Sequence, residues 1–131
     1  EDVIFQEKSM NNKDNNSLNS KNNFRRGFVE LMVLYLLSQD DNYYGWELTQ
    51  LIADLTNGFI QIPLGSFYPL LYKLIDAGYI TEEKRLVGKR RKRVYYHIED
   101  SGKERLKYLM DDYNATITAV QTVLSYHPRS E

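Results

Sequence analysis

The chain has 131 residues, 42% of them hydrophobic and 27% charged, and a formal net charge of −1, which suits one small domain with its own core. It contains no cysteine, which excludes disulfides and cysteine-ligated zinc and favours a cytoplasmic location. No apolar run approaches the roughly 20 residues that cross a bilayer, so we expect neither export nor a membrane partner.

The N-terminal part divides into a polar segment and an apolar helix. Residues 1–23 are rich in asparagine and have almost nothing to bury, so we expect a flexible tail. Residues 24–38 follow a helical pattern, and residues 28–37 are apolar nearly all round. Such a helix is buried on more than one side, either at the centre of the core or partly against a partner subunit.

A second helix is expected after a loop at residues 39–42. It begins near Tyr43 and ends at Asn57 and Gly58, which form a typical helix stop. Leucine and isoleucine recur between these points at helical spacing and predict one buried stripe. This would be the first helix of a helix-turn-helix.

A third helix with two unlike faces follows a linker at residues 59–64. Pro69 costs least in the first turn because proline lacks a backbone donor, so this helix should begin near Gly65 or Ser66. One face is apolar, and the other carries groups that can contact phosphates or base edges in a major groove. The candidate DNA contacts on this face are Ser66, Tyr68, Pro69, Tyr72 and Lys73, with Lys73 the best candidate for a base contact.

Residues 79–98 are typical of two strands around a turn near Gly88. Seven of the 17 basic residues lie within residues 84–93, which contain no acid. A run of this kind can be a solvated loop, but its place directly after the two-faced helix favours a DNA-binding wing. The candidate contacts on the wing are Lys89, Arg90, Arg91 and Arg93.

The last segment, residues 101–127, should form a long helix to about Ser125, opened by a capping box of Ser101 and Glu104. Its apolar residues alternate at spacings of four and three, the seam of a coiled coil. We therefore expect a homodimer in which this helix packs with residues 24–38 across a two-fold axis, and the alternative is a monomer. The candidate interface residues are Phe28, Leu31, Met32, Tyr35, Leu106, Met110, Tyr113, Ile117, Val120 and Leu124.

Five motifs in order resemble the PadR family of bacterial transcriptional regulators, over about residues 24–124. The motifs are Tyr44-Gly45-Trp46-Glu47-Leu48, Gly65-Ser66-Phe67-Tyr68-Pro69-Leu70-Leu71-Tyr72-Lys73-Leu74, Gly78-Tyr79-Ile80, Arg91-Lys92-Arg93-Val94-Tyr95-Tyr96 and Ser101-Gly102. The resemblance implies a winged helix with a C-terminal dimerisation helix. The element pattern agrees: a mainly α fold with a small β-hairpin, in which residues 24–100 form the winged helix-turn-helix and residues 101–127 the dimerisation helix.

The resemblance also implies a function. PadR-like proteins bind inverted-repeat operators, usually as repressors, and many are released by small aromatic or drug-like molecules. By this resemblance Tyr44 joins the predicted DNA contacts on the third helix and the wing. The C-terminal helix has no tryptophan, and Trp46 is the only one in the chain, so an effector site built on a tryptophan of that helix is not expected.

The sequence offers little for catalysis. It has no cysteine nucleophile and no phosphate-binding glycine loop, and neither His97 nor His127 lies in a recognisable constellation. We therefore expect no enzymatic activity, metal or cofactor. The alternative to a DNA-binding regulator is a winged-helix module whose basic hairpin binds an acidic partner. A protein interface would favour exposed apolar anchors, whereas Ser66, Tyr68 and Lys73 favour DNA.

Overall fold

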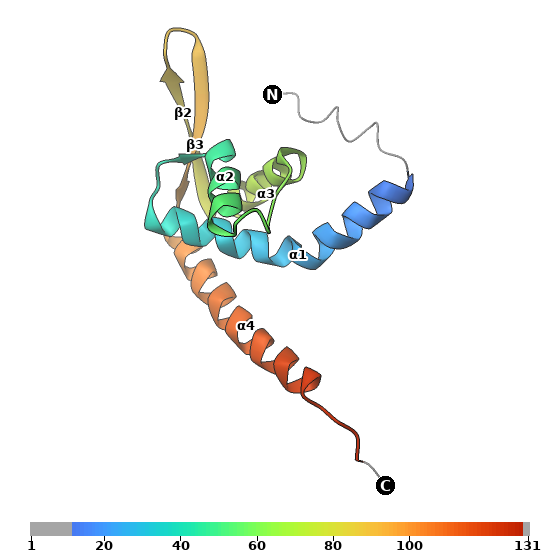
Figure 1. Cartoon of the computed structure of the whole chain (residues 1–131). Coiled ribbons are helices and arrows are strands. Elements are labelled where there is room, and N and C mark those ends of the chain that lie inside the picture. The colour runs from blue at the N-terminus through green and yellow to red at the C-terminus, as the bar shows by residue number, and fades with distance from the viewer. Residues whose placement is uncertain (1–11, 130–131) are drawn as a thin grey trace.

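The structure, a computed structural model, describes residues 12–129 and the side chains of residues 25–129. Figure 1 shows a helical head from which a β-hairpin and a long helix extend in opposite directions. In chain order the elements are α1 (Asn12–Gln39), β1 (Tyr43–Tyr44), α2 (Gly45–Leu55), α3 (Leu64–Asp76), β2 (Ile80–Val87), β3 (Arg91–Ile98) and α4 (Asp100–Leu124). Four helices with a small antiparallel sheet among the described residues confirm the predicted winged-helix fold.

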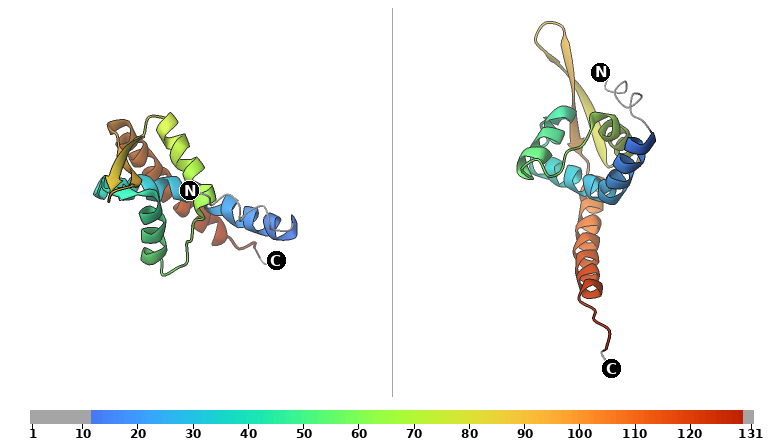
Figure 2. Two further views of the ribbon diagram at one scale, coloured as in Figure 1. Left: turned by 90° about the horizontal axis from the view of Figure 1, so that it is seen from above. Right: turned by 45° about the vertical axis from the view of Figure 1, so that its right-hand side comes forward.

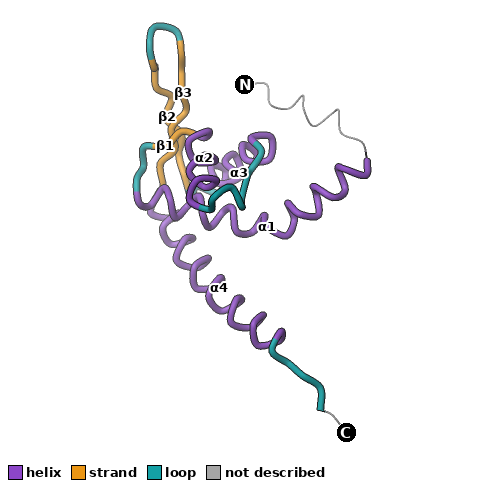
Figure 3. The backbone as a smooth tube through the Cα atoms, viewed as in Figure 1, coloured by secondary structure: helices purple, strands orange, loops and turns teal. Residues whose placement is uncertain are grey.

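The sheet determines how the wing stands on the head. Its strand order is β1-β3-β2, with antiparallel neighbours. β2 and β3 pair along their whole length, from Ile80 opposite Ile98 to Val87 opposite Arg91, whereas β1 pairs only with the base of β3. The outer half of the hairpin therefore lacks a third strand and projects beyond the helices, as Figures 2 and 3 show.

The core lies between α1, α2, α3, the base of the hairpin and the start of α4. On α3, Phe67, Leu71 and Leu74 are buried, as their helical spacing predicts. Each large apolar side chain that is fully buried contributes roughly 1.5–3 kcal/mol relative to exposure. The buried cluster consists of Val33, Leu34, Leu37, Leu48, Phe67, Leu71, Leu74, Ile80, Tyr96 and Leu106.

The first helix is longer than its apolar pattern predicts. α1 begins at Asn12, so residues 12–23, which we expected to be part of a flexible tail, are helical, and residues 1–11 of that predicted tail lie outside the described residues. Once a helix is nucleated, each added residue gains one backbone hydrogen bond. The helix therefore continues beyond the part that packs on the core.

Two other helix starts differ slightly from the predictions. α2 begins at Gly45 rather than near Tyr43, because Tyr43 and Tyr44 form β1 and pair with β3. A strand of two residues leaves no periodicity to detect. α3 begins at Leu64, one residue before the predicted start, which places Pro69 in its second turn.

The predicted capping box at the start of α4 is wrong. The N-cap is Glu99, and the Ser101 hydroxyl donates to the Gly78 carbonyl at 2.6 Å instead of capping the helix. The reason is tertiary: α4 begins directly against the turn between α3 and β2, where the Glu99 N–H also donates to the Tyr79 carbonyl at 2.9 Å. The Ser101 hydroxyl therefore bonds to a carbonyl of that turn and not to the free N–H groups of the first turn of α4.

Candidate nucleic-acid interface

α3 separates a buried face from an exposed one. Opposite the buried stripe lie Ser66, Pro69, Tyr72 and Lys73, all exposed. The Tyr72 side chain is 56% exposed. This face therefore presents a hydroxyl, an aromatic ring with a phenol group and an ammonium to solvent, groups that donate to phosphates and base edges.

Tyr68 is half-buried because its ring packs on the start of α2. A Cβ atom added at Gly45 would lie 2.9 Å from Tyr68 Cε1 and 3.0 Å from the phenolic oxygen. Glycine at position 45 therefore allows α3 to approach α2 closely. This contact sets the position of α3 relative to the helix before it.

Tyr44 and Arg93 meet at the base of the wing rather than pointing separately into solvent. The Arg93 guanidinium lies 4.4 Å from the centroid of the Tyr44 ring, and Tyr44 stacks on Trp46 with centroids 6.4 Å apart. Tyr95 meets Tyr44 edge-on at 5.7 Å. These residues form a cation–aromatic cluster between β1, β3 and the start of α2.

The tip of the wing carries cations that have no partner among the described side chains. Lys89 and Arg90 lie in the turn and Arg91 at the start of β3, and all three are exposed. Within residues 25–129 no acidic group pairs with any of them. Their charges are therefore available to an external anion.

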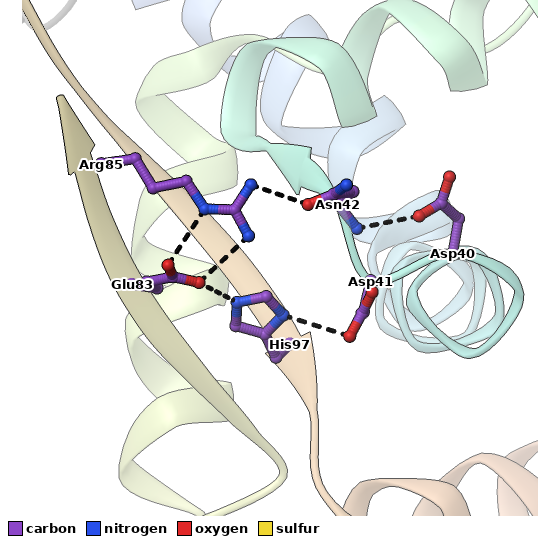
Figure 4. Close-up of polar contacts among 6 residues, drawn as sticks. All are labelled: Asp40, Asp41, Asn42, Glu83, Arg85 and His97. Atoms are coloured by element: carbon purple, nitrogen blue, oxygen red, sulfur yellow. Dashed lines mark hydrogen bonds and ion pairs between the residues drawn. The ribbon is translucent and has the colours of Figure 1, made fainter. Parts of the chain in front are cut away.

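Arg85 belongs to the same basic run but is used inside the structure. It donates to Glu83 from Nε and Nη2 at 3.0 and 3.1 Å, and to Asn42 Oδ1 from Nη1 at 2.7 Å. His97 lies beside it, between Glu83 and Asp41 (Figure 4). The hydrogen bonds from Arg85, followed by that from His97, lower the pKa of the Glu83 carboxyl to about 2.

Sequence reasoning missed this network because the network depends on strand register. Glu83 lies directly opposite Tyr95, so His97, two residues further along β3, is its diagonal neighbour, a separation that long side chains reach. Asp41 and Asn42 come from a loop far away in the chain. The alternation of Glu83 and Arg85 along β2 was the available sign of a charged face.

The candidate dimer residues of α1, together with Met110 and Tyr113 of α4, lie around the crossing of α1 and α4. Within one chain, Phe28 meets Tyr113 edge-on with ring centroids 5.8 Å apart, and Arg105 donates to Glu30 at 2.9 and 3.3 Å. Beside this contact is an open apolar hollow of about 350 Å³. Its lining residues are Leu31, Met32, Tyr35, Leu36, Ile52, Leu55, Thr56, Met110, Tyr113 and Asn114.

Farther along, α4 leaves the head and keeps apolar side chains in solvent. Val120 is 46% and Leu124 76% exposed, and Ile117 is half-buried. Leu106 differs from the other candidates because it is buried in the core of its own chain, which leaves little of it for a partner. Apart from Leu106, each candidate residue keeps part of its side chain exposed, and exposed apolar side chains are a feature of interaction sites.

Residues 12–129 contain no group of three or more histidine, aspartate and glutamate side chains that would hold a metal ion. No helix in this part of the chain has the length and hydropathy needed to cross a membrane.

Comparisons with known proteins agree with this geometry. A model of the Transcriptional regulator PadR-like family matches residues 33–108. An uncharacterised protein X of Lysinibacillus sphaericus is 31% identical over 88 residues, 67% of this chain and 80% of that protein. A PadR-like transcriptional regulator from Bacillus cereus is 30% identical, with a TM-score of 0.66 over 80% of this chain and 99% of its own.

PadR of Bacillus subtilis, solved in complex with operator DNA, has the same fold. It is 23% identical to this chain, and the likeness covers 79% of this chain and 50% of that one with a TM-score of 0.56. At this identity the comparison concerns the fold alone.

Proposed function

The chain belongs to the PadR-like family of transcriptional regulators, whose model covers 76 of its 131 residues (33–108), and from this we propose that it regulates transcription in the cytoplasm by binding operator DNA through α3 and the wing. A regulator of this family is not an enzyme. One observation carries the DNA proposal: the exposed polar face of α3 and the unpaired cations of the wing tip belong to adjacent elements of one small head. An α-helix fits the major groove, and a basic hairpin beside it reaches the flanking backbone.

In this arrangement α3 enters the major groove. Ser66, near the N-terminus of α3, and Tyr68 and Tyr72 would contact phosphates and base edges, and Lys73 is our candidate for a base contact. Pro69 is exposed on the same face, in the second turn of α3. Of these residues, Tyr68 is the one already held by the head, through Gly45.

The wing would follow the backbone or enter the adjacent minor groove. Lys89, Arg90 and Arg91 carry the charges that neutralise phosphates, and narrow A·T tracts attract arginine. Tyr44 and Arg93 complete the contact surface at the base of the wing, where their stacked side chains border the phosphates next to α3. All these residues are contributed by one chain, so one chain reads one half-site.

We propose a homodimer that reads an inverted repeat. The exposed seam of α4, which begins beside the apolar hollow between α1, α2 and α4, supports this assembly, because a second copy would cover the seam. Two heads in such a dimer would contact half-sites about one helical turn apart, roughly 34–36 Å. The presence of operator DNA in the structure of Bacillus subtilis PadR, which has this fold, favours DNA as the ligand of the head.

We further propose that the regulator is a repressor released by a small aromatic or otherwise hydrophobic effector. The hollow of about 350 Å³ has a mainly apolar lining, whose polar groups come from Thr56, Asn114 and the hydroxyls of Tyr35 and Tyr113. Ligand sites in proteins typically have volumes of about 300–1,000 Å³. The dimer would then have two arrangements, of which one binds DNA. An effector lowers DNA affinity only if its own affinity is higher for the arrangement that cannot bind DNA.

The test is a fluorescence-anisotropy titration of a duplex taken from upstream of the protein's own gene, against a scrambled duplex of equal length, at two salt concentrations. The variant changes Lys89, Arg90 and Arg91 together to alanine. Loss of three phosphate contacts should weaken binding and reduce the salt slope, log K against log salt, by about 3. The matched control removes three exposed cations from α4 and the C-terminus, Lys103, Lys107 and Arg129.

The outcomes separate the proposals. Tighter binding of the upstream duplex, weakened by the wing variant but not by the control, supports an operator-binding regulator. Equal binding of both duplexes would contradict sequence-specific recognition of that duplex. Absence of binding to either would favour the acidic-partner module, since the wing cations would then serve another anionic ligand.

A further inference from the structure

A polar network fastens the base of the wing to the head. It joins β2, β3 and the loop at residues 40–42, and its centre is His97 (Figure 4). Nε2 of His97 lies 2.7 Å from Glu83 Oε1 on β2, and Nδ1 lies 3.5 Å from Asp41 Oδ2 on the loop. Arg85 makes a second connection between the same two segments through Glu83 and Asn42.

The position of this network matters because the outer hairpin has no third strand beside it within residues 12–129, and the network and the stacking of Arg93 on Tyr44 join the base of the wing to the head. β1 pairs only with Tyr95 and Tyr96, and beyond these residues β2 and β3 have only each other as neighbours in the sheet. A two-stranded ribbon twists and bends easily when nothing packs on it. The network therefore lies where the wing leaves the head, at the point that sets its direction.

The number of contacts that His97 makes depends on its charge. A neutral imidazole has one N–H and one acceptor nitrogen, so it donates to one carboxylate, whereas an imidazolium donates from both nitrogens. Both ring nitrogens of His97 face carboxylate oxygens. Only the protonated ring can therefore bridge Glu83 on the wing and Asp41 on the head.

The surrounding charges act in the same direction. The charged groups packed against the His97 ring are Glu83 from β2 and Asp41 from the loop, with Arg85 behind Glu83 and Asp40 accepting from the Asn42 N–H at 3.0 Å. Arg85, Glu83, Asp41 and Asp40 sum to two negative charges, and an imidazolium at position 97 reduces that sum to one. Protonation thus also removes negative charge beside the basic wing.

We propose that His97 is a positioning residue for DNA binding: its protonated form clamps the wing to the loop at residues 40–42 and holds the wing in the direction that meets the backbone. The inference rests on the proposed function, in which the wing contacts DNA. Affinity for DNA should then rise as the pH falls, because the clamp is completed and the local charge becomes less negative. Glu83 and Arg85 hold the same joint at every pH in this range.

The test measures the affinity of the full chain for the upstream duplex between about pH 5.5 and 8, where histidine changes charge, at constant ionic strength. We expect affinity at the acidic end to be roughly two- to fivefold higher per wing, the size of one exposed ion pair. His97→Gln and Asp41→Asn should both flatten the profile. His127→Gln is the matched control, since these are the only two histidines in the chain and His127 is exposed beyond the end of α4.

A second readout does not depend on DNA. In NMR spectra of the free protein, the backbone amide signals of the wing should shift between about pH 5.5 and 8 in the wild type and in His127→Gln, and should not shift in His97→Gln. If the duplex is not bound but the pH-dependent shifts are lost in His97→Gln, His97 still holds the wing to the loop and only the DNA-binding proposal fails. The inference is overturned if His97→Gln keeps the wild-type dependence of DNA affinity on pH. It is also overturned if the amide signals of the wing change with pH in the same way in the wild type and in His97→Gln.

Discussion

Gly102 lies where α4 meets the turn between α3 and β2, and the change Gly102→Ala tests how tightly the two are joined. A Cβ atom at position 102 would be 2.2 Å from the Tyr79 carbonyl oxygen and 2.8 Å from Ile98 Cγ1. The carbonyl belongs to the backbone, so it cannot rotate away as a side-chain end can. We expect Gly102→Ala to force α4 and the turn apart.

The size of the effect follows from that contact. The Tyr79 oxygen would have to withdraw by more than 1 Å to reach the 3.4 Å of ordinary contact, and overpacking of this kind costs about 1–3 kcal/mol. The same movement weakens the hydrogen bond from the Glu99 N–H, 2.9 Å from that oxygen, which adds about 1 kcal/mol. We expect the free energy of unfolding to fall by about 2–4 kcal/mol.

Urea denaturation followed by circular dichroism measures this difference, and Gly27→Ala is the matched control. Gly27 lies in α1 with nothing within 4 Å of an added Cβ. Alanine in a helix interior is favoured over glycine by about 0.5–1 kcal/mol, so the same substitution should stabilise the protein there. Equal urea midpoints for Gly102→Ala and the wild type would show that α4 is not closely packed on the turn.

Three other changes test separate parts of the molecule. Gly45→Ala should lower the free energy of unfolding by about 1 kcal/mol and weaken operator binding in anisotropy assays, because the added methyl group displaces the Tyr68 ring. Unchanged binding would show that this contact does not position α3. Val120→Asp places a charge on the exposed seam of α4 and should shift sedimentation-velocity profiles toward monomer. Ala119→Asp, which lies off that seam, should not, and identical profiles for the two variants would contradict the proposed interface. The pKa of Glu83, lowered from 4.5 to about 2 mainly by Arg85, means that its carboxylate stabilises the fold above pH 4.5 and loses that effect as the pH falls toward 2. The difference in urea midpoint between the wild type and Glu83→Gln should therefore shrink over that range, and a constant difference would refute the assignment.

Periodicity predicted the parts of the fold that repeat over several turns or strand residues. The stripe of Phe67, Leu71 and Leu74 is buried because a helix brings every third or fourth residue to one side. The hairpin was predicted from β-branched and aromatic residues around Gly88, whose φ of 73° suits glycine in the turn. Local chemistry was sufficient for these elements.

Features that depend on contacts between distant segments could not be read in the same way. Ser101 and Glu104 have the spacing of a capping box, yet the Ser101 hydroxyl donates its hydrogen bond to a carbonyl of the preceding turn. Tyr43 and Tyr44 become a strand only because β3 is beside them. The joint around His97 requires the register of β2 and β3 together with a loop some 55 residues earlier in the chain. In each case a tertiary neighbour overrides a local pattern.

Register also divides the basic run of the wing into two functions. Arg85 and Arg93 lie directly opposite each other, and their guanidinium groups lie 4.1 and 4.4 Å from the ring centroids of Tyr95 and Tyr44. A planar guanidinium can stack on a ring and bind a carboxylate with two parallel hydrogen bonds, whereas an ammonium can do neither. Lysine at position 85 would keep the charge but lose the stacking on Tyr95 and the two parallel hydrogen bonds to Glu83. The exposed cations of the run, which have no such partner among the side chains of residues 25–129, are Lys84, Lys89, Arg90, Arg91 and Lys92. A wing that must present these charges in a fixed direction therefore needs arginine at its base, and the identity of the residue there matters as much as its charge.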